Sequence, residues 1–95
     1  MRRELARVPT EHAARYLQQL CKHWSHKLDV TLDGSTGVVR FPDAVATMTA
    51  EPDALVVLVE AADEGTLERM KGVVSNHLDR FAFSEAPLSF DWAMD

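Results

Sequence analysis

The most distinctive stretch of the chain is a twelve-residue segment that reads Tyr16-Leu17-Gln18-Gln19-Leu20-Cys21-Lys22-His23-Trp24-Ser25-His26-Lys27. It contains a Tyr, a Trp, the only Cys and two of the four His of the chain. Through this segment and just beyond both of its ends, apolar residues recur at spacings of three and four, namely Ala13, Leu17, Leu20, Cys21, Trp24 and Leu28. Because this period places them on one face of a helix, the sequence predicts an amphipathic helix from Glu11 to about Lys27. Thr10, just after Pro9, is the expected N-cap.

Strand patterns precede and follow this helix. Residues 3–8 alternate weakly and predict a first strand, and residues 29–32 and 38–41 predict a hairpin around the turn-forming residues 33–37. Residues 44–50 alternate and predict a strand with one inward face, and residues 55–59 are apolar on both faces. The connections between these strands are short, so neighbouring strands must pair antiparallel.

A second helix is predicted from a cap at Asp63 to about Phe81. Its apolar stripe consists of Leu67, Met70, Val74, Leu78 and Phe81. Gly72 lies inside it, at a cost of about 1 kcal/mol relative to Ala, and is expected to permit a close approach of the helix to its neighbour. Residues 88–92 then alternate and predict a last strand.

The predicted order is therefore strand, helix, four strands, helix, strand. It corresponds to an α+β two-layer sandwich in which two helices cover one face of an antiparallel sheet, with residues 1–95 as a single domain. The opposite face would expose Val45, Thr47, Val56, Leu58 and their neighbours. An exposed apolar sheet face is typical of a partner surface, so we expect a homodimer.

The composition excludes several classes of protein. The net charge is −5, which argues against nucleic-acid binding, although residues 1–40 carry seven basic against four acidic residues. That excess makes either a local basic face or a surface complementary to the acidic second half. No apolar run reaches the roughly 18 residues of a membrane span, and Met1 to Leu5 lack the apolar core of a signal peptide. A lone cysteine fits a reducing compartment, so a cytoplasmic protein without membrane partners is expected.

A metal ion is the one cofactor that the sequence suggests. Cys21 and His23 lie about 160° apart around a helix and cannot share a metal, and Cys21 falls on the apolar stripe, where it is expected to be buried. His23 and His26 are three residues apart and could supply two nitrogen ligands. A third ligand would have to come from His77, with Glu60 or Asp79 as further candidates.

A ligand-binding groove is the stronger interpretation. Tyr16, His23 and Lys27 follow one flank of the first apolar stripe, and His77 and Arg80 flank the second. If the two flanks face each other, these five residues would line a groove for an anionic small ligand or a metal chelate. The alternative is that they form solvated helix flanks.

Other chemistry is not indicated. The glycines do not form a phosphate-binding loop, and Ser25 and His26 are neighbours on a helix, where side chains point about 100° apart. No nucleophile with a base can be placed, which argues against an enzyme. Two hypotheses remain: a small binding protein, and a dimerisation module without ligand chemistry.

Three motifs carry a resemblance to a known family: the segment 16–27 quoted above, then Glu60-Ala61-Ala62-Asp63, then His77-Leu78-Asp79-Arg80-Phe81-Ala82-Phe83. Over essentially its whole length the chain resembles the bacterial domain of unknown function 2218. The resemblance implies no catalytic residues. It implies a context, because such domains occur near or fused to flavin-dependent siderophore-interacting reductases. The expected function is therefore an accessory role in iron or siderophore use, with any reductase as a separate partner protein.

Overall fold

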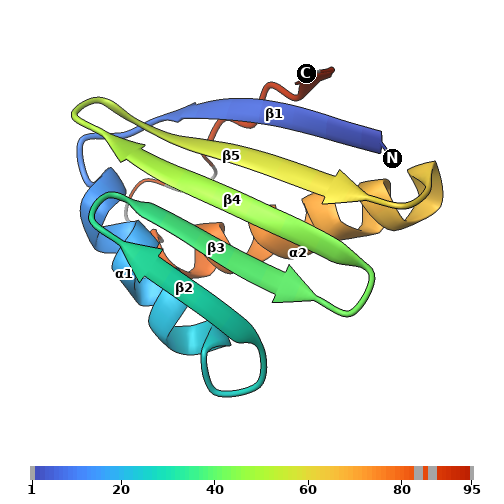
Figure 1. The fold of residues 1–95 in the computed structure, drawn as a ribbon. Coiled ribbons are helices and arrows are strands. Elements are labelled where there is room, and N and C mark those ends of the chain that lie inside the picture. Colours follow the sequence, from blue (N-terminus) through green and yellow to red (C-terminus); the bar gives the residue numbers. More distant parts are fainter. Residues whose placement is uncertain (1, 83–84, 86–87, 95) are drawn as a thin grey trace.

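The structure, a computed structural model of the chain, describes residues 2–82, 85 and 88–94. Its elements are β1 (Arg2–Pro9), α1 (Ala13–Trp24), β2 (Asp29–Asp33), β3 (Thr36–Phe41), β4 (Ala44–Glu51), β5 (Ala54–Ala61), α2 (Glu64–Phe81) and β6 (Ala93–Met94). The strands form one antiparallel sheet in the order β2-β3-β4-β5-β1-β6, with both helices packed behind it (Figure 1). The predicted α+β class and the predicted order of elements are confirmed.

The core lies between the helices and one face of the sheet. In β4 the residues Ala44, Ala46 and Met48 are buried, whereas Val45 and Thr47 between them are half-buried on the opposite face. The alternation continues in β5, which is apolar on both faces. Buried residues of both helices complete one continuous cluster, and α1 contributes Ala13, Tyr16, Leu17, Leu20, Cys21 and Trp24.

A glycine lets α1 pack close to the sheet. A Cβ atom on Gly37, in β3, would lie 2.6 Å from Sγ of Cys21 and 2.9 Å from Cδ1 of Leu17, both closer than real side chains approach. Gly72, in α2, has no such neighbour within 4 Å. The expectation that Gly72 permits a close helix approach is therefore wrong, and the close approach is at Gly37.

The helix ends differ in how well the sequence predicts them. Asp63 caps α2 as expected, since its carboxylate accepts a hydrogen bond of 2.8 Å from the Thr66 amide, and this bond lowers the pKa of Asp63. The N-cap of α1 is His12, without a side-chain capping bond, so the expected cap at Thr10 is wrong. The Thr10 hydroxyl instead accepts a hydrogen bond from the His12 amide. The helix also ends at Trp24, before Lys27, and turns follow it.

The side chains of the C-terminal segment alternate as in a strand, but its backbone forms only a short ladder. The sequence predicts a strand at residues 88–92, but the ladder comprises only Ala93 and Met94, paired with Leu5 and Glu4. The alternating apolar residues of the predicted strand, Leu88, Phe90 and Trp92, are half-buried and pack against the core. The alternation therefore reflects packing of one side of the segment, while the backbone pairs with β1 only at its end.

In the part of the chain that the structure describes, no helix is both long and apolar enough to cross a membrane.

A candidate ligand pocket between the two helices

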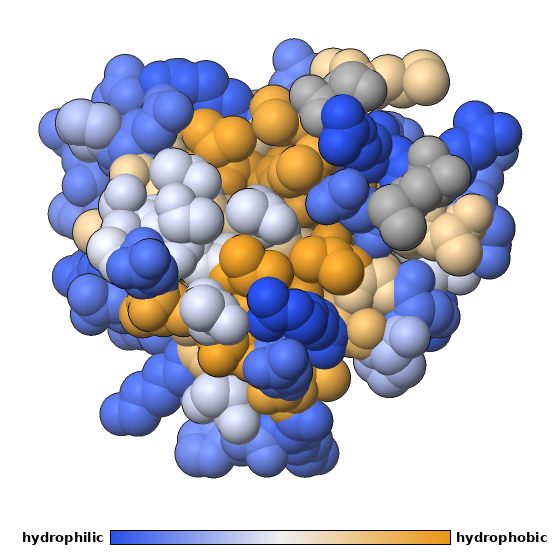
Figure 2. All heavy atoms as spheres, in the orientation of Figure 1, coloured by the Kyte–Doolittle hydropathy of each residue, from blue (hydrophilic) through white to orange (hydrophobic). Residues whose placement is uncertain are grey.

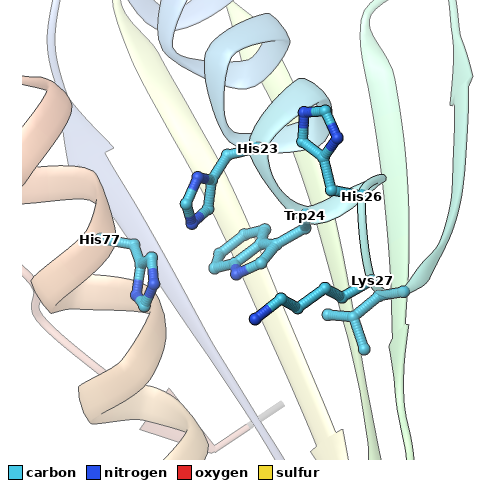
Figure 3. A pocket seen from close by; sticks show the side chains of 6 residues that line it. His23, Trp24, His26, Lys27 and His77 are labelled. Carbon is cyan, nitrogen blue, oxygen red and sulfur yellow. The ribbon is translucent and has the colours of Figure 1, made fainter.

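The helices enclose a pocket at the C-terminal end of α1. Its volume is about 390 Å³, within the range of small-molecule sites. Figure 3 shows its lining, to which the last turn of α1, the turns after it and α2 all contribute. The lining residues are His23, Trp24, His26, Lys27, Leu28 and His77.

Aromatic rings form the inner wall. Trp24 is only 6% exposed, and its indole packs against Phe41 of β3 with 5.5 Å between ring centroids. The ring of His77 lies 5.2 Å from the indole and 5.4 Å from the ring of His23. Three rings from two helices therefore meet at one place, and a planar ligand group would find π-surfaces on more than one side.

A backbone hydrogen bond fixes the orientation of His77. Its Nδ1 lies 2.7 Å from the carbonyl oxygen of Val73, one turn earlier in α2. Because a carbonyl oxygen can only accept, Nδ1 carries the hydrogen and donates it. In the neutral ring Nε2 then has a free lone pair, which can accept a hydrogen bond from a ligand or bind a metal ion.

The polar groups of the pocket favour an anion. The described lining residues comprise one lysine and three histidines, and no carboxylate is among them. In Figure 3 the Lys27 side chain runs past the indole of Trp24 toward α2, whereas His26 points away from His77. The ammonium group thus lies beside an aromatic wall, where it can pair with a carboxylate or phenolate while the ligand ring packs on Trp24.

The pocket contains three of the five residues expected to line a groove, namely His23, Lys27 and His77. Arg80 is exposed in the last turn of α2 and does not line it. Tyr16 lies elsewhere, buried with its hydroxyl bonded to Glu85. Trp24 and Leu28 belong to the pocket although the sequence places them on the apolar stripe, because a stripe residue at a helix end can face both a core and a cavity.

His23 and His26, expected as a pair of metal ligands, both line the pocket. In the described residues, however, no group of three or more His, Cys, Asp or Glu could hold a metal ion. A metal in this pocket would therefore need further ligands from a bound molecule, as it would have in a chelate.

Comparison with known proteins places the chain in a family. The model of a family described as "Uncharacterized protein conserved in bacteria (DUF2218)" matches residues 5–93. The chain belongs to this family. Among solved structures it is similar to the "NMR structure of PA4090 from Pseudomonas aeruginosa", with 41% identity, a TM-score of 0.84, and coverage of 98% of this chain and 96% of the other. The comparison with curated proteins gave no match.

The DUF2218 match includes both helices and every residue of the pocket. Neither the family nor the similar structure from Pseudomonas aeruginosa brings an activity with it. The chain is thus an α+β member of a bacterial family without an assigned function.

A second polar cluster of this DUF2218 chain lies at the start of α1. The Tyr16 hydroxyl donates a hydrogen bond to the Glu85 carboxylate, and the Thr10 hydroxyl donates to the same group at 3.0 Å. Burial raises the pKa of Tyr16, and the bond to Glu85 raises it further. Chiefly because of the bond from Tyr16, the pKa of Glu85 is lowered. The cluster ties the segment after α2 to the start of α1, and it is a structural feature.

Cys21 is not a reactive group. It is 3% exposed, and burial raises the pKa of its thiol, so little thiolate forms near neutral pH. We expect the folded protein to resist labelling by iodoacetamide or Ellman's reagent at about pH 7.5, and the protein in urea to react with one equivalent. Rapid labelling of the folded protein, at a rate close to that in urea, would contradict the burial of this thiol.

Proposed function

We propose that this protein binds a small anionic ligand with an aromatic ring, or a metal chelate of such a ligand, in the pocket between α1 and α2. The observation that supports this most directly is the combination of Lys27 and the imidazoles of His23 and His77 around the indole of Trp24. Such a lining offers charge-assisted hydrogen bonds at one end of a ligand and ring surfaces at the other.

The same lining residues can also contact a metal chelate, which is larger than the free ligand. Two imidazoles with their ring centroids 5.4 Å apart can donate hydrogen bonds to, or coordinate, the periphery of a complex whose metal ion is held by other groups. The resemblance to proteins associated with siderophore-interacting reductases suggests an iron complex, and we propose an accessory role in iron or siderophore use on that basis. A catechol carboxylate, free and as its ferric complex, is therefore the probe of choice.

The test is a fluorescence titration with the Trp92→Phe variant, in which Trp24 is the only indole. We expect 2,3-dihydroxybenzoate to quench Trp24 with saturation at micromolar concentrations. The neutral amide of the same acid should bind at least about tenfold more weakly, because it cannot pair with Lys27 as an anion does. Repeating the titration with the ferric complex measures the preference for the chelate.

Matched variants assign the signal to the pocket. Lys27→Met keeps most of the side-chain length and removes the charge, so it should weaken binding about tenfold or more. Lys22→Met removes a charge from an exposed position of α1 outside this pocket and should leave the affinity within about twofold. Equal affinities in the two variants, or no saturation by either form of the probe up to millimolar concentration, would refute the proposal.

A further inference from the structure

The sheet has one open face. Both helices lie behind it in Figure 1, and Figure 2 shows that apolar and weakly polar side chains gather over its middle, with hydrophilic ones toward the rim. The apolar side chains on this face are half-buried within one chain. Faces of this kind usually mark an interaction surface. The half-buried apolar side chains of this face are those of Leu5, Val38, Val45, Val56 and Leu58.

The strand register arranges this face in three rows that cross the strands from β2 to β1. The middle row is uncharged, and charges lie in the two rows beside it. Outside these three rows, Glu51 at the end of β4 forms an ion pair of 3.3 Å with Arg7 of the same chain. The middle row is Thr31, Val38, Thr47, Leu58 and Leu5; the first outer row is Asp29, Arg40, Val45, Glu60 and Arg3; the second is Asp33, Thr36, Thr49, Val56 and Arg7.

The charges in each outer row have opposite signs at positions equally far from β4 on its two sides. From β2 to β1 the first outer row carries minus, plus, neutral, minus, plus, with β4 at the centre. The second row carries minus at β2 and plus at β1. When each row is read in the opposite direction, from β1 to β2, every charge in the sequence of signs is replaced by the opposite charge. A surface with this property attracts a second copy of itself that is turned about its central strand.

We propose that two copies of the chain pack face to face through this surface, related by a two-fold axis parallel to β4. The rotation stacks β2 on β1 of the second copy, β3 on β5 and β4 on β4. Asp29 then faces Arg3 of the second copy, Arg40 faces Glu60, and Asp33 faces Arg7, each contact occurring twice. The apolar centre is buried between two aligned sheets about 10 Å apart.

The other face-to-face arrangement is disfavoured by the same charges. A two-fold axis across the strands would stack β2 on β2 and exchange the two outer rows. Asp29 would then face Asp33 of the second copy, and Arg3 would face Arg7. Like charges placed opposite each other weaken association, so the pattern selects the axis parallel to β4. The surface lies on the side of the sheet away from the pocket, and the dimer is therefore independent of ligand binding.

The test exchanges charges within ion pairs that already exist in one chain. Asp29 and Arg40 are 3.5 Å apart, and Arg3 and Glu60 are 3.7 Å apart. The variants Asp29→Arg/Arg40→Glu and Arg3→Glu/Glu60→Arg each keep an ion pair within the chain and the net charge of −5. Each nevertheless makes the first outer row symmetric, so that two copies of the same variant place like charges opposite each other.

We expect sedimentation equilibrium to give the wild-type chain twice its mass of 10.6 kDa and each variant alone the mass of a monomer, with dissociation constants raised about a hundredfold or more. An equimolar mixture of the two variants should form a heterodimer, because their rows are complementary again. Circular dichroism checks that both variants fold. A monomeric wild type at millimolar concentration, variants that dimerise as the wild type does, or a mixture that stays monomeric would each overturn the proposal.

Discussion

Replacing Gly37 by Ala is expected to lower the free energy of unfolding by about 1–3 kcal/mol. The new Cβ would lie 2.6 Å from Sγ of Cys21 and 2.9 Å from Cδ1 of Leu17, and both side chains are buried. Because a close-packed interior offers little room for either side chain to move, α1 has to shift away from β3. Urea unfolding followed by circular dichroism measures the change.

The matched control is Gly72→Ala. A Cβ atom at Gly72 would have no neighbour within 4 Å. Because Ala has a higher helix propensity than Gly, this variant should raise the free energy of unfolding by about 0.5–1 kcal/mol. A second control adds Cys21→Ala to Gly37→Ala. Removing the sulfur should relieve part of the strain, with a coupling energy of about 0.5–3 kcal/mol. Changes of the same sign at both glycines, or strictly additive effects of the Gly37 and Cys21 substitutions, would show that the packing of α1 on β3 is not tight.

These two glycines illustrate what a sequence can and cannot specify. Hydrophobic period predicts both helices and the middle strands, because each element must turn one apolar face toward a single core. Gly37 stands beside turn residues, so the sequence pattern assigns it to the turn, whereas Gly72 stands alone in a predicted helix. Whether a glycine is required depends on which atoms of a distant element face it, and a local pattern carries no information about that.

Part of the pocket can also be predicted from the hydrophobic period of the two helices. Helical spacing places His23 and Lys27 on one flank of the first predicted helix, although α1 ends at Trp24 in the structure, and a second flank with His77 follows from the period of α2. The meeting of these flanks near the end of α1 depends on how the two helices cross. Their crossing brings His77 beside Trp24 and leaves Arg80 outside the pocket.

The open sheet face shows a further limit. Alternation in β4 and β5 predicts that an apolar face remains uncovered, and an uncovered face suggests a partner. The order of charges across it is invisible in the sequence, since Asp29, Glu60 and Arg3 become neighbours in one row only through the register of five strands. That order supports our proposal that the partner is a second copy of the chain.

The sequence predicts Tyr16 on the flank of an apolar stripe with its hydroxyl in water, whereas in the structure Tyr16 is buried and its hydroxyl bonds a residue 69 positions away. Its hydroxyl is removed from water and donates to the Glu85 carboxylate, which also accepts from Thr10. A buried hydroxyl needs such a partner, and a bond to a charged acceptor is stronger than one to a neutral group. The substitution Tyr16→Phe removes the bond and keeps the ring, so it isolates the contribution of this contact.

We expect Tyr16→Phe to lower the free energy of unfolding by about 1–2 kcal/mol at about pH 7. The bond depresses the pKa of Glu85, so its contribution is present above the ordinary pKa of 4.5 and is lost as the pH falls through the lower folded value. The pKa of Tyr16 is raised, so its contribution is present below 10.0 and is lost as the pH rises through the higher folded value. The difference between wild type and variant should therefore be largest between about pH 5 and 9 and shrink on both sides.

Urea unfolding at several pH values measures this difference, and absorbance near 295 nm reports the phenol of Tyr16 directly, because the chain has one Tyr. Glu11→Gln is the control: Glu11 is exposed near the same end of α1, and its substitution should leave the stability within about 0.5 kcal/mol. Two results would mean that the hydroxyl does not donate to the Glu85 carboxylate in solution. One is ionisation of the phenol below pH 10.0 in the folded protein. The other is a stability difference between wild type and Tyr16→Phe that does not vary between about pH 3 and 11. Ionisation above pH 10.0, together with loss of the difference in acid, would establish that the segment after α2 is held to α1 by this pair.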